Sequence, residues 1–351
     1  MDLSFWKGKR VFLTGHTGFK GSWLCRILVR AGAVVTGYSL APDSDSNLFS
    51  ICAVENKIDS IIGDIRDNEK LKHAFIHAQP EIVIHMAAQP LVRKSYQEPA
   101  YTYEVNVMGT INILESTRLC TSVKSFLNVT TDKVYRNNEW EWGYRESDQL
   151  GGHDPYSSSK SCSELITQSY NSVFFPNTGV STARAGNVIG GGDFAADRII
   201  PDCVRAAIIN EPIIVRNPRS IRPYQHVLEP LFAYLLIAQK QYDDIKFASN
   251  YNVGPDDCDC VSTGTLVDIF CTAWGDGASW KNISDSGPHE ATFLKLDCSK
   301  IKSKIGWMPR WNVKNAIEKT VEWTKVFINH KQDIPTTMDN QILEFLQKKD
   351  A

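Results

Sequence analysis

Two ionisable side chains, Tyr156 and Lys160, stand four positions apart in a segment with helical spacing, so they are expected to share one helix face. A tyrosine phenol has a reference pKa of about 10, and a nearby ammonium stabilises its ionised form and lowers that pKa. The phenolate could then take a proton from a hydroxyl while hydride leaves the same carbon. Standing alone, the pair is more typical of an exposed helix face, so its interpretation depends on the rest of the chain.

A glycine-rich turn at residues 15–21 (GHTGFKG) lies between a strand-like run and a helical pattern. Glycines at positions 15, 18 and 21 would let the backbone approach a dinucleotide pyrophosphate closely, and the start of the following helix favours its negative charge. The strand before and the helix after are the context that this motif requires. We therefore predict dinucleotide binding rather than a plain turn.

The cofactor is expected to be NAD. The second strand ends at Ser39, whose hydroxyl can hydrogen-bond an adenosine ribose but cannot repel a 2′-phosphate. No arginine stands at Ser39 or just after it to receive such a phosphate. Asp64, beyond the third strand, is a candidate partner of the adenine ring, although an ordinary surface turn explains this aspartate nearly as well.

Thr131, Asp132 and Lys133 follow the fifth strand-like run, at the edge where ligands of open α/β sheets bind. The Thr131 hydroxyl could hydrogen-bond a substrate oxygen, and Asp132 with Lys133 could supply a proton acceptor and a donor. A Thr-Asp turn with a solvated lysine explains the same residues about equally well. The residues alone leave both interpretations open.

Strand-like runs alternate with helical patterns in the first half of the chain. Strands are predicted at residues 10–14, 34–38, 58–62, 82–85, 125–130 and 180–184, and helices at 21–30, 68–78, 100–120 and 156–175. The alternation predicts an α/β fold with a Rossmann-type doubly wound parallel sheet. After Asn187 the frequent prolines and glycines predict a smaller, mixed α/β substrate domain.

The domain boundaries follow from this rise in proline and glycine content after Asn187. We expect residues 1–186 to form the NAD-binding domain, with a return segment near residues 226–253. Residues 187–225 and 254–330 would form the substrate-binding domain. Residues 331–351 are predicted to form a peripheral tail, because the stretch is polar.

Composition excludes several classes of partner. A net charge of -2 over 351 residues gives no reason to expect nucleic acid or an anionic membrane. The N-terminus lacks the apolar core of a signal peptide and no stretch could cross a bilayer, so a cytoplasmic protein is expected. The nine cysteines are scattered without a C-x-x-C pair, which predicts reduced thiols and no metal site.

Taken together, these residues resemble the extended short-chain dehydrogenase/reductase family. The landmarks are the glycine spacing, His85–Ala88 after the fourth strand, Tyr156 with Lys160, and Arg184–Asn187 at the domain transition. Within the family, Thr131-Asp132 followed by an ionisable residue is similar to the sugar-nucleotide 4,6-dehydratases, most of which have glutamate at the place of Lys133. Lys133 and the strings WEWGYRE (140–146), GGHDPY (151–156) and RPYQHV (222–227) are similar to the branch that acts on CDP-glucose.

The resemblance implies a lyase reaction on a nucleotide sugar, in which C4 of CDP-glucose is oxidised, water is eliminated across C5–C6 and hydride returns to C6. Tyr156, activated by Lys160, would take the 4-hydroxyl proton, and Thr131 would bind the 4-oxygen. Asp132 and Lys133 would manage the elimination, unless Lys133 only orients Asp132. The alternative is a dehydratase or 4-epimerase for a dTDP-, GDP- or UDP-hexose, and an epimerase needs no acid/base pair for eliminating water.

The resemblance also implies the binding residues and the assembly. The cofactor-binding residues would be Gly15, Thr17, Gly18, Phe19, Gly21, Ser39, Asp64, Ile65, Ala87 and Ala88, with Tyr156 and Lys160. The substrate-binding residues would be Gln89, Asn187, Arg198 and Arg222. Family members assemble through helices packed between subunits, so a homodimer or homotetramer is expected. Their products usually enter deoxysugars of bacterial surface polysaccharides.

Overall fold

The computed structural model describes residues 2–42, 47–283 and 293–347. Its centre is a seven-stranded sheet in the order β11-β6-β5-β4-β1-β2-β3, in which every neighbouring pair is parallel. The strands are β1 (Arg10–Thr14), β2 (Val34–Ser39), β3 (Asp59–Ile62), β4 (Ile82–His85), β5 (Ser125–Val129), β6 (Gly179–Ala185) and β11 (Asn250–Val253). The predicted Rossmann-type doubly wound α/β fold is confirmed.

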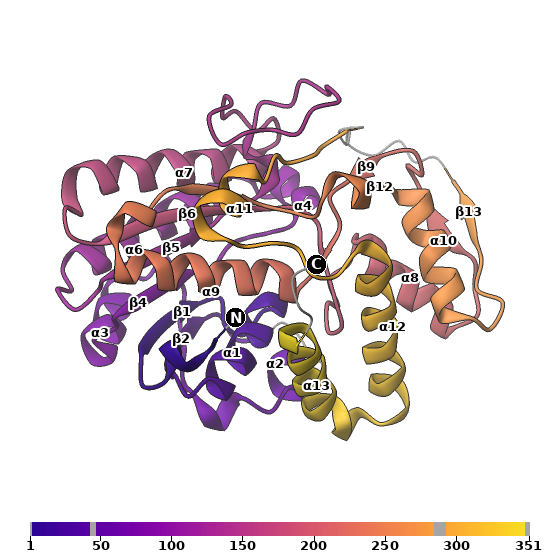
Figure 1. The fold of residues 1–351 in the computed structure, drawn as a ribbon, viewed down its shortest axis with the longest axis horizontal. Helices are drawn as coiled ribbons and strands as arrows, with labels where there is room; N and C mark the ends of the chain where they lie inside the picture. Colours follow the sequence, from indigo (N-terminus) through magenta and orange to yellow (C-terminus); the bar gives the residue numbers. More distant parts are fainter. Residues whose placement is uncertain (1, 43–46, 284–292, 348–351) are drawn as a thin grey trace.

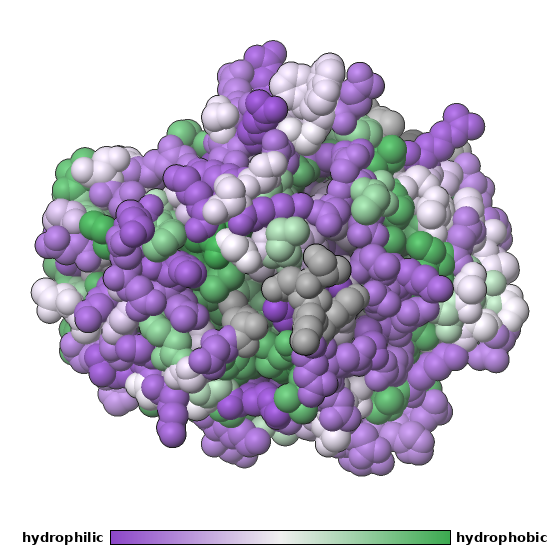
Figure 2. Space-filling view, in the orientation of Figure 1, coloured by the Kyte–Doolittle hydropathy of each residue, from purple (hydrophilic) through white to green (hydrophobic). Residues whose placement is uncertain are grey.

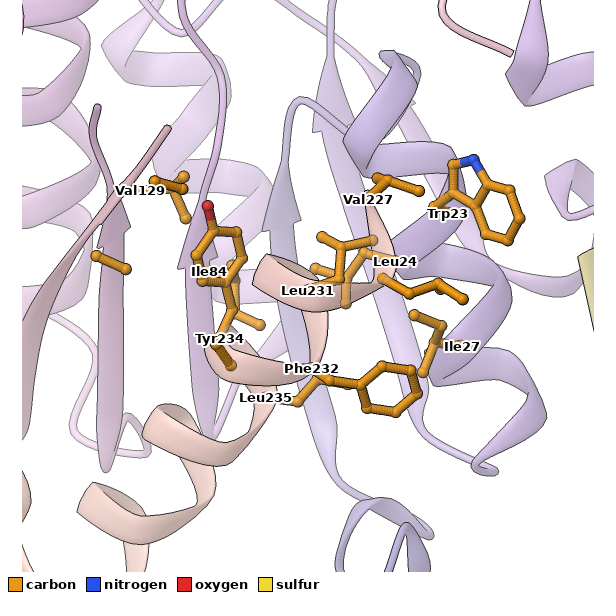
Figure 3. Close-up of a cluster of buried hydrophobic side chains, with 14 of the residues drawn as sticks. Trp23, Leu24, Ile27, Ile84, Val129, Val227, Leu231, Phe232, Tyr234 and Leu235 are labelled. Atoms are coloured by element: carbon orange, nitrogen blue, oxygen red, sulfur yellow. The ribbon is translucent and has the colours of Figure 1, made fainter. Parts of the chain in front are cut away.

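Helices cover both faces of this sheet (Figure 1). On one face lie α1 (Phe19–Arg30) and α9 (Leu228–Asp243), and on the other lie α3 (Asn68–Ala78), α6 (Gly109–Arg118) and α7 (Pro155–Phe174). Side chains of a strand point alternately to its two faces. Accordingly Val11 and Leu13 of β1 enter the core under α1 and α9, whereas Phe12 packs beneath α3 and α6. Figure 3 shows the first of these cores, where Leu231 and Phe232 of α9 meet Leu24 and Ile27 of α1.

The helix expected over residues 100–120 is interrupted. Helix α5 (Pro99–Tyr103) runs into a π-helical turn, η3 (Glu104–Met108), before α6 begins. Inside that turn the buried Asn106 amide donates to the Gln89 carbonyl at 3.1 Å and to the Ser159 hydroxyl at 2.9 Å. The π turn therefore brings a polar side chain inward, where it ties the loop after β4 to α7. Upstream, α4 (Val92–Gln97) continues that loop, and α2 (Leu48–Ile51) lies beside α1.

The chain passes more than once between the main sheet with its covering helices and a second, smaller body. A smaller core gathers buried side chains of α8 (Ile199–Ile208), α10 (Thr263–Trp274) and α12 (Val313–Asn329). The short paired strands are β7 (Val188–Ile189) with β10 (Gln225–His226), β9 (Ile221–Arg222) with β12 (Val261–Ser262), and β8 (Ile213–Val215) with β13 (Trp280–Asn282). The return segment expected near residues 226–253 contains α9 and β11, and β11 is the edge strand of the main sheet. After it, α11 (Ser299–Ile305) packs against β11.

The last described helix, α13 (Ile334–Gln347), differs from the peripheral tail expected over residues 331–351. Four apolar residues at helical spacing are buried in the main core: Ile334, Met338, Ile342 and Phe345. The Arg26 guanidinium of α1 also donates two hydrogen bonds to the Asp339 carboxylate, at 2.8 and 2.6 Å. Helix α13 is thus part of the layer that covers α1 (Figure 1).

Polar side chains cover most of the face seen in Figure 2, and hydrophobic atoms form scattered islands on it. No helix within residues 2–42, 47–283 and 293–347 combines the length and the hydrophobicity that a membrane span requires. In the same described residues, no three His, Cys, Asp or Glu side chains gather as a metal ion would require.

Candidate active site

The loop between β1 and α1 is shaped by its glycines. Gly15 has a φ of 77°, and a Cβ there would lie 2.9 Å from the Ala87 nitrogen. At Gly21 a Cβ would lie only 2.1 Å from the Gly15 carbonyl oxygen, so the helix packs directly on the loop. Gly18 caps α1 without a side-chain hydrogen bond, which leaves the first turn open to an anion. These residues form a cradle that fits a dinucleotide pyrophosphate.

Replacing Gly21 by alanine should therefore loosen this loop. The added methyl group overlaps backbone, which cannot swing aside as a flexible side chain would. We expect at least a tenfold loss of NAD affinity, corresponding to about 1.4 kcal/mol, measured by calorimetric titration. Gly254→Ala is the control, since it lies outside the cradle and its Cβ would meet the Cys298 sulfur at 3.5 Å, an ordinary van der Waals contact. Equal NAD affinity in Gly21→Ala and the parent protein would contradict the assignment.

The expected adenosine end lies beside β2 and β3. The Thr17 and Ser39 hydroxyls are hydrogen-bonded at 2.8 Å, and Thr17 also donates to the Leu40 carbonyl. The Asp64 carboxylate forms an ion pair with Arg66 at 2.7 Å, and this interaction lowers the pKa of Asp64. A surface pocket here is lined by Asp64, Arg66, Asp67, Glu104 and Met108. The hydroxyls are available for a ribose, and the role of Asp64 stays a prediction.

Helix α7 begins where the sequence predicts. The Asp154 carboxylate accepts from the Ser157 N–H at 3.0 Å, and Pro155 occupies the first turn. The helix holds Tyr156 and Lys160 against the carboxyl end of β5, where both are buried and the Lys160 ammonium donates to the Val129 carbonyl at 3.1 Å.

The pKa values of Tyr156 and Lys160 differ from the expectation that the ammonium lowers the pKa of the phenol. Burial raises the pKa of Tyr156 to about 12, although a hydrogen bond with Thr131 opposes that change. Burial, together with the nearby Lys20 ammonium, lowers the pKa of Lys160 to about 8. The lowered tyrosine pKa expected from the sequence is not found, because desolvation of the phenolate outweighs its favourable contacts. A ligand that adds positive charge beside Tyr156 would reverse that balance.

Thr131 and Asp132 meet the same tyrosine. Thr131 hydrogen-bonds Tyr156 and also donates to the Asp132 carboxylate at 3.0 Å. Asp132 is only 2% exposed, and its Oδ2 atom has no hydrogen-bond partner. Burial raises the pKa of Asp132, whereas the charges of Lys133 and Arg222 oppose that rise. Asp132 and Lys133 do lie in a turn capped by Thr131, but Asp132 is buried and Lys133 is half-buried, which favours the acid/base interpretation; the role of each residue stays a prediction.

The two arginines expected to bind a diphosphate lie on the side of the smaller body. Arg222 is buried, donates to the Ile221 carbonyl at 2.9 Å, and its charge acts on Asp132. Arg198 is half-buried, pairs with Asp193 at 2.9 Å, and its charge acts on Tyr156. Both arginines therefore lie close enough to the candidate catalytic residues for their charges to act on them.

Two of the expected substrate-binding residues have other contacts. The Gln89 amide donates to the Thr102 hydroxyl at 2.9 Å and accepts from the Leu91 N–H at 2.6 Å. Its side chain therefore holds the loop after β4 in place. Asn187 is half-buried, and its carbonyl accepts from the Gln225 N–H at 3.0 Å, which joins β7 to β10. A direct contact of either residue with substrate stays a prediction.

A buried ion pair supports the catalytic strands, and no motif in the sequence indicated it. Glu164 and Arg184 are 0% and 1% exposed and meet at 2.9 Å. Glu164 also accepts hydrogen bonds from Thr130 and Thr182, so its carboxylate joins α7 to β5 and β6. Arg184 reaches on to the Tyr135 hydroxyl at 2.8 Å.

Comparison with known proteins places this geometry in a family. The sequence profile of the family described as GDP-mannose 4,6 dehydratase matches residues 12–320. The chain belongs to this family. The match to the GDP-mannose 4,6-dehydratase family covers nearly all of the main sheet and of the smaller body, and every candidate site residue named above. With it, the membership in the extended short-chain dehydrogenase/reductases expected from the glycine loop and the Tyr156 pair is confirmed.

Individual relatives agree with this family. The chain is 49% identical over 336 residues to a CDP-glucose 4,6-dehydratase of Salmonella typhimurium, covering 93% of this chain and 94% of the relative. It is 26% identical to a CDP-paratose 2-epimerase of Salmonella typhi, covering 90% and 99%. Among solved structures, a dTDP-glucose 4,6-dehydratase of Bacillus anthracis in complex with NAD superposes with a TM-score of 0.79 at 19% identity, covering 93% and 98%.

Proposed function

We propose that this protein is a CDP-glucose 4,6-dehydratase, which converts CDP-D-glucose to CDP-4-keto-6-deoxy-D-glucose. The observation that carries the proposal is the 49% identity, over nearly the whole of both chains, to a protein of that name. The site agrees with it, because a hydroxyl-binding threonine, a buried tyrosine and a buried acid stand together at one sheet edge. NAD, which relatives of this fold hold, is the proposed cofactor.

In the first half of the reaction, the chain must remove the 4-hydroxyl proton of the sugar. NAD, when bound, supplies the hydride acceptor for this step and the hydride donor for the last. The Tyr156 oxygen is the proposed proton acceptor, and Thr131, which already hydrogen-bonds it, would hold the sugar 4-oxygen. Lys160 would turn from the Val129 carbonyl to the ligand and stabilise the phenolate by its charge.

In the second half, water must leave across C5 and C6. A 4-keto group acidifies the proton on C5, so a base and an acid suffice for the elimination. Asp132 and Lys133 are the proposed pair, and Asp132 has both a raised pKa from burial and an oxygen without a partner. A carboxyl with a raised pKa suits proton donation to the departing hydroxyl. Lys133 would then serve as the base for C5 or orient Asp132.

The substrate diphosphate is assigned to Arg198 and Arg222. A planar guanidinium can bind phosphate oxygens in a forked manner, and the charges of Arg222 and Arg198 act on Asp132 and Tyr156 respectively. Asn187, at the transition between the two bodies, is the proposed third contact.

Purified protein should be incubated with NAD and separate CDP-, dTDP-, GDP- and UDP-glucose. We expect the loss of one water from CDP-glucose, read by product mass, and at least about 100-fold slower conversion of the other three. An isomer of unchanged mass would instead indicate a 4-epimerase. Faster turnover of a different nucleotide would overturn the CDP assignment while leaving the dehydratase chemistry intact.

Replacing Asp132 by asparagine should separate the two halves of the reaction. The amide keeps the size of the side chain but cannot transfer a proton, so dehydration should fall about 10²–10⁴-fold. Oxidation at C4 needs only Tyr156 and should persist, seen as a rise in NADH absorbance when substrate is added. Lys133→Gln should also slow dehydration and retain C4 oxidation if Lys133 is the base. A dehydration rate near that of the parent protein would mean that Lys133 only orients Asp132.

The proposed homodimer or homotetramer rests on exposed apolar side chains of the helices that the family packs together. Leu165 and Val173 of α7 are 54% and 66% exposed, and Met108 and Leu119, at the two ends of α6, are 49% and 61% exposed. Exposed apolar groups gathered on one helical layer mark an interaction surface.

Leu165→Arg should give the mass of one 39.4 kDa chain in analytical ultracentrifugation, because the new charge would have to be buried in the interface. Ile209→Arg, at an equally exposed apolar residue of the smaller body, is the control and should leave the assembly unchanged. A parent protein that sediments as a single chain would contradict the proposed assembly.

A further inference from the structure

Tyr234 is a buried phenol that the proposed mechanism does not use. It lies on α9 in the return segment and is 0% exposed. Its hydroxyl has no hydrogen-bond partner within residues 2–42, 47–283 and 293–347. Leu231 and Ala238, which flank it at helical spacing, are buried apolar residues, so a phenylalanine would fit here without an unpaired polar group. Because a buried hydroxyl without a partner is costly, its presence points to a partner outside the chain.

The Tyr234 hydroxyl faces the edge of the sheet where the candidate catalytic residues lie. Figure 3 shows it pointing along the sheet toward Val129, the last residue of β5, whose carbonyl receives the Lys160 ammonium. Burial raises the pKa of Tyr234, and the charges of Tyr156 and Asp132 raise it further. The phenol therefore stays protonated at neutral pH and can donate a hydrogen bond.

The ring of Tyr234 also borders the glycine cradle. Its centroid lies 5.9 Å from Nζ of Lys20, a residue in the first turn of α1. Tyr156 belongs to α7 on one face of the sheet, whereas Tyr234 belongs to α9 on the other face. The two phenols therefore approach the carboxyl end of the sheet from opposite faces, and Tyr234 does so between the cradle and the candidate catalytic residues.

We propose that the Tyr234 hydroxyl donates a hydrogen bond to the carboxamide oxygen of the nicotinamide and so holds the ring in one orientation. This inference rests on the proposed function, in which the ring must lie beside Tyr156 for hydride to move. A carboxamide oxygen is a neutral acceptor that suits a neutral phenol in a site shielded from water. Since the carboxamide stands on one side of the ring, a bond to it selects which ring face meets the sugar.

A water molecule bound by the same hydroxyl is the competing explanation, and a truncated cofactor distinguishes the two. ADP-ribose keeps the adenosine, the pyrophosphate and the second ribose of NAD but lacks the nicotinamide ring. A bond to the carboxamide strengthens NAD binding and leaves ADP-ribose binding unaffected. A water held by the hydroxyl would act on both ligands alike. The ratio of their dissociation constants therefore separates the two roles without any turnover.

The test titrates NAD, NADH and ADP-ribose into the full-length parent protein and into Tyr234→Phe by calorimetry. Phenylalanine keeps the ring and removes only the hydroxyl. We expect the Kd values of NAD and NADH to rise about tenfold, and that of ADP-ribose to change less than about twofold. Because the lost hydroxyl bonds no described residue, the free energy of unfolding without cofactor should not fall. A fall would assign the hydroxyl a structural role and overturn the inference.

Tyr242→Phe is the matched control, because it removes a phenol from the same helix. The Tyr242 hydroxyl donates to the Glu81 carboxylate at 2.9 Å, next to the amino end of β4. This variant should keep the parent ratio of Kd values. An unchanged Kd for NAD in Tyr234→Phe, or an equal loss for ADP-ribose, would overturn the inference alone. Failure of the parent protein to bind either NAD or NADH would overturn the proposed function as well.

Discussion

Tyr156→Phe is expected to lower kcat by about 10³-fold or more while leaving the affinities for NAD and CDP-glucose within about threefold of the parent values. Phenylalanine fills the same buried space, so the fold should persist, but no oxygen remains to take the 4-hydroxyl proton. The hydrogen bond from the phenol to Thr131 is lost as well, which leaves the proposed site for the sugar oxygen without its partner. Steady-state rates and calorimetric titrations together measure this split.

The control for this loss is Tyr170→Phe, which removes a phenol from the same helix near its C-terminal end, away from Thr131 and Asp132. It should retain the parent kcat. The parent kcat should also rise with pH through the pKa of Tyr156, because the active form is the deprotonated one; burial raises this pKa, and the positive charge of bound NAD opposes the rise. A Tyr156→Phe enzyme with more than about a tenth of the parent kcat would refute the role of the phenol as base.

Glu164→Gln is expected to destabilise the protein by about 3–5 kcal/mol, because it leaves the buried Arg184 guanidinium without its counter-ion. The free energy of unfolding, measured by urea titration, should fall by this amount. The double variant Glu164→Leu with Arg184→Met should recover much of the loss, since no unpaired charge is then buried. Glu69→Gln, which breaks the exposed pair with Lys72, should cost less than about 1 kcal/mol. A loss of less than about 1 kcal/mol in the free energy of unfolding of Glu164→Gln would show that the Glu164–Arg184 pair is not needed for stability.

Much of the fold was predictable because one periodicity dominates each element. The strand at residues 10–14 and the helix at residues 68–78 have the predicted bounds, since an apolar run or an Asp67 cap marks their ends. The π turn within residues 104–108 was not predictable, because one extra residue per turn leaves no mark on hydrophobic spacing. Helix α13 was missed for another reason: its apolar residues recur at helical spacing, but the polar residues between them dominate the composition.

The site was predictable where chemistry and position coincide. Gly15 and Gly21 meet in one loop, and Tyr156 and Asp132 both lie beside Thr131, because each of these residues stands at the carboxyl end of a strand or the start of the next helix. The Glu164–Arg184 pair joins residues 20 positions apart, which no local pattern reveals. Likewise Gln89 faces inward because Thr102 and Leu91 bind its amide, and partners of that kind are known only once the chain has folded.

The bond from Arg26 to Asp339 has a consequence for the order in which the molecule is completed. The two residues are 313 positions apart, so α1 acquires its outer cover only after nearly the whole sequence between them has been synthesised. Contacts between such distant positions slow folding, since a long stretch of chain must be brought together first. A growing polypeptide on the ribosome therefore presents the bare side of its first helix for most of translation, which is where a chaperone would act.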